Sequence, residues 1–309
     1  MLIISSEASF DDRHNVSKPR IPVTENIQGN MTLNQTLRSK MVKRVAFGSL
    51  MTLVICISKT VIADPIDVRD MVASIRDEIT DTTIVVKRLS DGQIWMSNPE
   101  RAHIQYSPAS TSKVPHTIIA LKNGIATTTT IFPWDGVSRS VRAWNQDQTL
   151  ASAFQKSAVW VYQEIAQSTG REVMSDELQS LAYGNMDVGT FGDTPRYWLD
   201  GTLRISAMEQ IEFLSKLAQE AFPLSASTYA STKAIMESDR GSNWVMRSKT
   251  GWRYSKDNMD IGWHVGWVEC SSDEYIFALN LDMPDTRYLA HRTKITYAVL
   301  QDIGAFDCE

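Results

Sequence analysis

The fold of this 309-residue chain is organised around one stretch, which reads Gln105-Tyr106-Ser107-Pro108-Ala109-Ser110-Thr111-Ser112-Lys113-Val114-Pro115-His116-Thr117-Ile118-Ile119-Ala120-Leu121. Pro108 and the apolar residues 118–121 predict a buried helix that is entered from a turn. Ser110 and Lys113 are three residues apart, so the lysine amine can reach the serine hydroxyl and take its proton. The stretch predicts a nucleophile with its own base, although Ser-x-x-Lys alone also occurs by chance.

The segment ahead of this stretch has the three-part plan of a secretory signal. Residues 41–44 end in the basic pair Lys43-Arg44, residues 45–58 are mostly apolar, and a small residue, Ala63, precedes the expected cleavage point. The apolar run is shorter than the roughly 20 residues that span a membrane, so an uncleaved anchor is the weaker alternative. We therefore predict a signal peptide at 41–63, a non-native or disordered extension at 1–40, and one catalytic domain at 64–309.

Charge and cysteine content narrow the class of protein. The net charge is −5, and the predicted mature part is more acidic still, which argues against a nucleic-acid partner. Cys56 lies in the predicted signal, which leaves Cys270 and Cys308. In an exported chain these two either pair or stay free, and the sequence leaves both options open, as it does the oligomeric state.

Hydrophobic periodicity predicts helices and strands in a particular order. Apolar spacing predicts helices at 66–79, 150–168, 205–217 and 289–304, and β-rich runs predict strands at 82–88, 93–96, 244–250, 262–268 and 275–281. Asp91-Gly92 makes the first two strands a hairpin. Strands at both ends with helices between them predict an α+β fold, in which one antiparallel sheet is formed by both termini and a mostly helical insertion carries Ser110.

Three further motifs follow the first in order: Ser157-Ala158-Val159, Tyr183-Gly184-Asn185 and Lys249-Thr250-Gly251. With Ser110-x-x-Lys113 they resemble the penicillin-recognising serine enzymes, and within them the class D β-lactamases, or oxacillinases. The runs 106–111, 157–163, 197–207 and 262–269 are also similar to class D sequence and stand in the right order. The resemblance implies a three-layer α/β/α fold of the β-lactamase/transpeptidase type over the whole mature chain.

The resemblance assigns the catalytic centre to the first motif. Ser110 would be acylated by the β-lactam, and Lys113 would carry a carbamate made from carbon dioxide that serves as the general base. Only a neutral amine attacks carbon dioxide, so burial that lowers the lysine pKa favours this modification. The resemblance implies no other cofactor and no metal, and it lines the lysine pocket with Val159, Trp198 and Leu199, the Trp198 indole N–H steadying the carbamate.

The remaining motifs would handle the substrate. Ser157 resembles the serine that relays a proton to the leaving nitrogen, and Tyr183-Gly184-Asn185 is interpreted as structural support. The backbone N–H groups of Ser110 and Trp252 would form the oxyanion hole. The residues expected to bind substrate, including its carboxylate, are Lys249, Thr250, Gly251, Trp252 and Arg292.

Three positions depart from the family pattern. Ser112 stands where phenylalanine is common, Trp160 where proline is often found, and His116 where asparagine or a similar small polar residue is common. A hydroxyl at Ser112 would make the surroundings of Lys113 more polar and thereby disfavour carbamylation. The departures leave the acylating residues intact and put turnover in question.

The sequence thus predicts an exported, periplasmic class D β-lactamase that hydrolyses penicillins and other β-lactams and has no membrane span once the signal is cleaved. One alternative is a penicillin-binding sensor or slowly deacylating protein, and another is a cell-wall peptidase that uses the same serine. Metal-dependent hydrolysis is disfavoured because the histidines of the mature chain show no ligand spacing. They are His103, His116, His264 and His291.

Overall fold

The computed structural model describes residues 64–75, 81–192, 195–255, 259–271 and 273–308. All of them belong to one of the two units into which the chain divides, residues 59–309. The predicted extension at 1–40 and the predicted signal peptide at 41–63 lie outside the described residues.

A seven-stranded sheet in the order β1-β3-β2-β9-β8-β7-β6 forms the centre of the fold. As predicted, strands from the two ends of the sequence share this sheet, and they meet where β2 pairs antiparallel with β9. Among the described strands only β1 departs from the antiparallel pattern, because the chain enters alongside the open edge of β3 and pairs with it in parallel. The strands are β1 Ile66–Asp67, β2 Thr82–Arg88, β3 Ile94–Met96, β6 Glu237–Arg240, β7 Trp244–Arg253, β8 Asp260–Cys270 and β9 Glu274–Met283.

Every strand predicted from the sequence is present. β2 and β3 form the predicted hairpin, whose turn contains Gly92 with a φ of 76°. A positive φ carries little steric cost for glycine, which explains the Asp-Gly signal. The last three predicted strands are longer than their apolar runs, because β7, β8 and β9 remain paired to one another beyond them.

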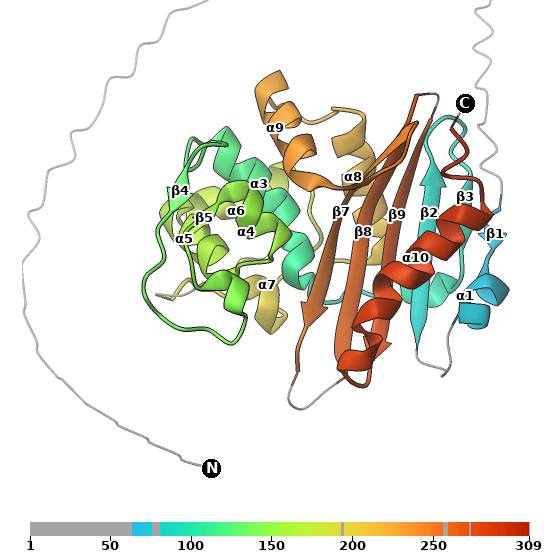
Figure 1. Cartoon of the computed structure of the whole chain (residues 1–309), viewed down its shortest axis with the longest axis horizontal. Helices are drawn as coiled ribbons and strands as arrows, with labels where there is room; N and C mark the ends of the chain where they lie inside the picture. The colour runs from blue at the N-terminus through green and yellow to red at the C-terminus, as the bar shows by residue number, and fades with distance from the viewer. Residues whose placement is uncertain (1–63, 76–80, 193–194, 256–258, 272, 309) are drawn as a thin grey trace, which may run out of the picture. The chain divides into compact units, whose positions relative to one another are not determined.

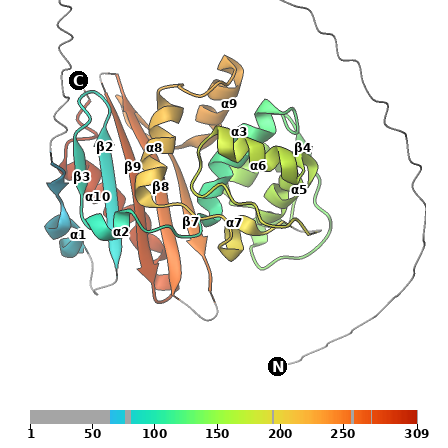
Figure 2. The same ribbon diagram turned by 180° about the vertical axis from the view of Figure 1, so that it is seen from behind.

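Helices cover both faces of the sheet and produce the predicted three layers. In β2, Val85 packs beneath the helical insertion, whereas Ile84 and Val86 pack on the side of α10, His291–Asp302. Successive strand residues point to opposite faces, so one strand serves both cores. Figure 1 shows α10 across one face, and Figure 2, seen from behind, shows α8, Ala207–Ala218, on the other. The short helix α1, Arg69–Ile75, packs beside α10.

The insertion between β3 and β6 is mostly helical, as predicted. It also holds a small two-stranded sheet of β4, Ile131–Phe132, and β5, Gln148–Thr149. Besides α8, its helices and 3-10 turns are α2 Pro99–Ala102, η1 Ala109–Ser112, α3 Lys113–Lys122, η2 Arg142–Trp144, α4 Leu150–Gln155, α5 Val159–Thr169, α6 Arg171–Ser180, α7 Tyr197–Asp200 and α9 Ala226–Met236.

One predicted helix, 150–168, is wrong, because the structure divides it into α4 and α5. Between them Ser157 has a φ of 56°, in the left-handed region that a right-handed helix excludes. Apolar periodicity continues across this short break and carries no information on a single backbone dihedral. The break has a functional consequence, since it sets Ser157 apart from both helices.

Other helix boundaries move for local reasons. The predicted helix at 205–217 begins instead at Ala207, because Ser206 and Glu209 form a capping box. The first predicted helix opens as β1 and becomes helical only at Arg69, and its last residues, 76–79, lie outside the described residues. The final helix is preceded by a 3-10 turn, η3, Thr286–Ala290.

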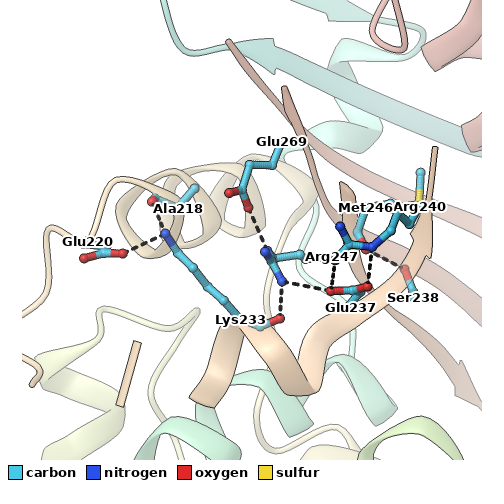
Figure 3. A network of polar contacts seen from close by, with 9 residues as sticks. All are labelled: Ala218, Glu220, Lys233, Glu237, Ser238, Arg240, Met246, Arg247 and Glu269. Carbon is cyan, nitrogen blue, oxygen red and sulfur yellow. Dashed lines mark hydrogen bonds and ion pairs between the residues drawn. The ribbon is translucent and has the colours of Figure 1, made fainter. Parts of the chain in front are cut away.

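The helical layer is fastened to the sheet where α9 runs into β6. Arg247 of β7 donates from Nη1 to the Lys233 carbonyl at 2.6 Å and from Nε to Glu269 Oε2 at 2.8 Å. Figure 3 shows its guanidinium between Glu269 and Glu237, with Lys233 directed to Glu220 and the Ala218 carbonyl. These contacts hold the α9–β6 corner against β7, two residues before Lys249.

Cys270 and Cys308 form a disulfide, with their Cα atoms 5.5 Å apart. The bond ties the end of β8 to the C-terminal segment that follows α10 and closes a loop of 38 residues. This selects one of the two options that the sequence left open.

Candidate active site

Ser110 lies in η1, the single 3-10 turn that leads into α3. Thr111 fastens this turn, since both its backbone N–H and its hydroxyl donate to the Pro108 carbonyl. Lys113 Nζ donates to Ser110 Oγ at 3.0 Å, which is the juxtaposition that the three-residue spacing predicts. Ala109 has a φ of 48°, a conformation that costs energy for a residue other than glycine. The nucleophile candidate therefore sits on a strained but well-fastened turn.

The Lys113 side chain is fully buried, and the described residues place no counter-ion beside it. No carboxylate of the described residues forms an ion pair with it, and its Nζ lies 5.0 Å from the centre of the Tyr162 ring. Burial lowers the pKa of Lys113 well below its ordinary value, and the nearby positive charge of Lys249 lowers it further. Burial therefore favours the neutral amine form of Lys113, the form that can accept a proton or react as a nucleophile.

The three residues predicted to line the lysine pocket differ in how deeply they are buried. Trp198, on α7, is fully buried, and its carbonyl accepts a hydrogen bond from Ser107 Oγ at 2.7 Å. Its indole Nε1 has no hydrogen-bond partner among the described residues. Val159, at the start of α5, and Leu199, beside Trp198, are both partly exposed. Trp198 is therefore the one of the three that offers an unused donor.

Ser112 does not present its hydroxyl to the lysine as a free polar group. Its Oγ donates to the Ala109 carbonyl at 2.8 Å, inside the same 3-10 turn. A hydroxyl satisfied by the backbone adds less polarity to its surroundings than a free one. This contact weakens the sequence-based concern that Ser112 disfavours modification of Lys113.

Ser157 and Lys249 come together from opposite sides of the site. The break between α4 and α5 places Ser157 Oγ 2.6 Å from Lys249 Nζ, which donates to it and also to the Thr250 carbonyl at 2.9 Å. Burial, helped by the charge of Arg292, lowers the pKa of Lys249 to about 7. The pair can therefore exchange a proton near neutral pH.

The part of β7 that follows its pairing with β6 lies against the nucleophile turn. A Cβ added at Gly251 would lie 3.0 Å from the Pro108 carbonyl oxygen and 3.2 Å from Thr111 Cγ2. The backbone of Gly251 is thus closely approached by the protein's own nucleophile turn. Thr250 lies next to it, partly buried, whereas Trp252 is exposed and its Nε1 donates to Asp260 Oδ2 at 2.7 Å.

Arg292 reaches the same strand from α10. Its Nη1 donates to the Gly251 carbonyl at 2.7 Å and its Nε to the Leu289 carbonyl at 2.8 Å. Partial burial lowers its pKa to about 10, so it remains a cation at neutral pH. The positive charge of Arg292 is therefore held against the Lys249-Thr250-Gly251 segment.

Tyr183-Gly184-Asn185 supports the site from behind. Gln210 donates to the buried Tyr183 hydroxyl at 3.2 Å and to Thr111 Oγ1 at 3.0 Å, which links this motif to the nucleophile turn. A Cβ at Gly184 would lie 2.0 Å from the Arg204 carbonyl oxygen, so only glycine fits there.

The sequence reasoning assigned no role to a polar cavity beside Lys249. The cavity has a volume of about 480 Å³ and borders α4, α9, β7 and α10. In its wall Ser248 Oγ lies 2.7 Å from Ser238 Oγ and 3.1 Å from Nε2 of the buried His264. Burial lowers the pKa of His264 to about 3. The sequence signal that could have indicated this cavity is His264, a histidine within the otherwise mostly apolar strand β8. No cluster of metal-binding residues occurs in the described part of the chain.

Comparison with known proteins agrees with this fold and site. A family model of the penicillin binding protein transpeptidase domain matches residues 84–303. β-Lactamase OXA-3 of Pseudomonas aeruginosa is 42% identical over 228 residues, which is 72% of this chain and 80% of that protein. β-Lactamase OXA-48 of Klebsiella pneumoniae is 39% identical over 210 residues, which is 68% of this chain and 78% of that protein.

A solved structure gives the same result. The class D β-lactamase FUS-1 (OXA-85) of Fusobacterium nucleatum subsp. polymorphum superimposes with a TM-score of 0.73 at 33% identity, over 77% of this chain and 98% of that one. Fold and site thus define a serine enzyme built on the penicillin-binding transpeptidase domain. Within that class the chain belongs to the class D β-lactamases, which are hydrolases of β-lactams.

Proposed function

We propose that this protein hydrolyses penicillins, and other β-lactams besides, through an acyl-enzyme at Ser110. The observation that carries the proposal is the 3.0 Å contact between Ser110 Oγ and the buried, counter-ion-free amine of Lys113. A strained cyclic amide opens when a nucleophile, a base, an oxyanion site and a carboxylate anchor act together. The described residues supply a candidate for each of these parts.

Each residue has a separate task in ring opening. Ser110 Oγ attacks the β-lactam carbonyl, and the developing oxyanion is bound by the backbone N–H groups of Ser110 and Trp252. Ser157, which accepts a hydrogen bond from Lys249, passes a proton to the leaving nitrogen. The substrate carboxylate lies against the Thr250 hydroxyl and the Lys249 and Arg292 charges, while Gly251 lets the turn and the strand come close.

Carbamylation of Lys113 is part of the proposal because the pocket suits it. Burial favours the neutral amine of Lys113, and Trp198 Nε1–H is a buried donor that lacks an acceptor among the described residues. A carbamate would supply a carboxylate-like base for acylation and for activating the deacylating water. Trp198 would hold it by donating from Nε1, and Val159 and Leu199 would close the pocket from α5 and α7.

Steady-state hydrolysis of a penicillin, measured with and without added bicarbonate, tests the proposal. We expect many turnovers per enzyme, faster hydrolysis with bicarbonate, and loss of turnover in both Ser110→Ala and Lys113→Ala. A single turnover followed by a stable adduct would instead identify a penicillin-binding sensor. Cleavage of a D-Ala-D-Ala peptide in preference to penicillin would identify a cell-wall peptidase.

We also propose that the protein is exported to the periplasm. The Cys270–Cys308 disulfide supports this, since such bonds persist in oxidising compartments. Within the described part of the chain, no helix has the length and apolar character needed to cross a membrane. Fractionation of expressing cells tests the proposal: the mature protein should be released with the periplasm and begin near residue 64.

A further inference from the structure

His116 lies in the lysine pocket, one helical turn after Lys113 on α3. The imidazole is fully buried, and its centre is 4.9 Å from the Trp198 indole, which meets it edge to face. The centre of the Tyr162 ring is 6.3 Å from that of His116, and the same Tyr162 ring is 5.0 Å from Lys113 Nζ. Tyr162 thus lies beside both the Lys113 amine and His116, and Trp198 packs against His116.

The hydrogen bonds of His116 indicate which ring nitrogen carries a proton that has no acceptor. Nε2 lies 2.7 Å from the Tyr197 hydroxyl, whereas Nδ1 has no partner among the described residues. If Nε2 donated to Tyr197, the tyrosine proton and the Nδ1 lone pair would both be buried without a partner. If Tyr197 donates to Nε2, only one hydrogen is unpaired, the one on Nδ1. The second arrangement is favoured, and it makes Nδ1–H a donor.

His116 Nδ1 and Trp198 Nε1 are thus two N–H donors without an acceptor among the described residues, and they belong to rings that pack against each other. Buried donors without acceptors are rare because each loses its hydrogen bond to water. Burial lowers the pKa of His116 to about 3, so the ring is neutral and acts as a donor without carrying charge. Two neutral donors beside a buried amine suit a small anion formed on that amine.

We propose that His116 is a positioning residue that donates from Nδ1 to the carbamate on Lys113, as a second donor beside Trp198. This inference rests on the proposed carbamylation. In that reaction Lys113 Nζ bonds to the carbon of carbon dioxide, one C=O π pair moves onto oxygen, and one amine proton is released to solvent. His116 lies on α3, which begins at Lys113 directly after the turn that carries Ser110, so it fixes the orientation of the base relative to the nucleophile.

The test is the affinity of Lys113 for carbon dioxide, read from the carbamate signal in ¹³C NMR during titration with ¹³C-bicarbonate. Asparagine places its amide nitrogen near the position of Nδ1, whereas glutamine places a polar atom near Nε2 and keeps a partner for Tyr197. We expect His116→Asn to retain wild-type affinity and His116→Gln to lose about tenfold or more, the value of one hydrogen bond to a charged group. His264→Asn, a change at another buried histidine with an unpartnered Nδ1, is the matched control and should retain wild-type affinity.

The outcomes separate this inference from the proposed function. If His116→Gln binds carbon dioxide as well as the wild type, or if both variants lose affinity equally, His116 Nδ1 does not hold the carbamate. If the wild type gives no carbamate signal while it hydrolyses penicillin, carbamylation itself is wrong. If His116→Gln does not fold, ¹⁵N-histidine spectra of the wild type decide: the His116 Nδ1–H signal should shift on addition of bicarbonate, and an unchanged signal overturns the inference.

Discussion

Burying the Lys249 amine lowers the free energy of unfolding by an amount that depends on pH, and replacing Lys249 with methionine should remove this dependence. The ordinary pKa of lysine is 10.5, and burial lowers that of Lys249 to about 7. Between these values the unfolded chain holds a proton that the folded protein has released, so stability increases as pH rises. One pKa unit corresponds to about 1.4 kcal/mol, so wild-type stability should gain about 4 kcal/mol relative to Lys249→Met between roughly pH 7 and 10. Methionine keeps the length of the side chain without its charge.

The measurement is the free energy of unfolding from denaturant titrations at a series of pH values. The hydrogen bonds from Lys249 to Ser157 and to the Thr250 carbonyl are also lost, but their loss shifts the whole curve rather than its slope. Lys216→Met, a change at an exposed lysine of α8, is the control and should leave the slope as in the wild type. Parallel curves for wild type and Lys249→Met would refute the reasoning, because the buried amine would then titrate as an exposed one does.

Three further changes test other parts of the site and fold. Gly251→Ala should push the nucleophile turn away from β7, since the new Cβ would lie 3.0 Å from the Pro108 carbonyl oxygen, and should reduce kcat/KM about tenfold or more; an unchanged kcat/KM would contradict this. Ser157→Ala removes an acceptor 2.6 Å from Lys249 Nζ, so kcat for penicillin should fall about a hundredfold, and a wild-type kcat would exclude the proton relay. Cys270→Ser opens the 38-residue loop and should lower the free energy of unfolding by about 4 kcal/mol, as measured by denaturant titration, whereas a loss below about 1 kcal/mol would argue against the disulfide.

The sheet and the nucleophile turn were predictable because their signals are local. Alternating and β-branched residues mark strands such as Thr82–Arg88, and the three-residue spacing of Ser110 and Lys113 brings their side chains together on one turn. The order of the elements also predicted that strands from both ends share one antiparallel sheet, whereas the particular pairing of β2 with β9 was not predicted.

The parts that were missed depend on single dihedrals or on contacts between distant residues. A φ of 56° at Ser157 interrupts a run that is periodic throughout, and this break positions the Ser157 hydroxyl for Lys249. The distance between Cys270 and Cys308 is set by how the last helix packs, which no spacing in the sequence encodes. His116 was noticed only as an unusual residue, because its free nitrogen is defined by Tyr197, which lies 81 residues away in the chain.

Intact-mass spectrometry after rapid mixing with a penicillin tests the central claim most directly. The account predicts that the wild type gains the mass of one penicillin within the first turnover, that the gain maps to the peptide containing Ser110, and that it disappears as hydrolysed product accumulates. Ser110→Ala should show no adduct. Turnover without any adduct under conditions that trap the acyl-enzyme, or an adduct that forms equally on Ser110→Ala, would contradict it.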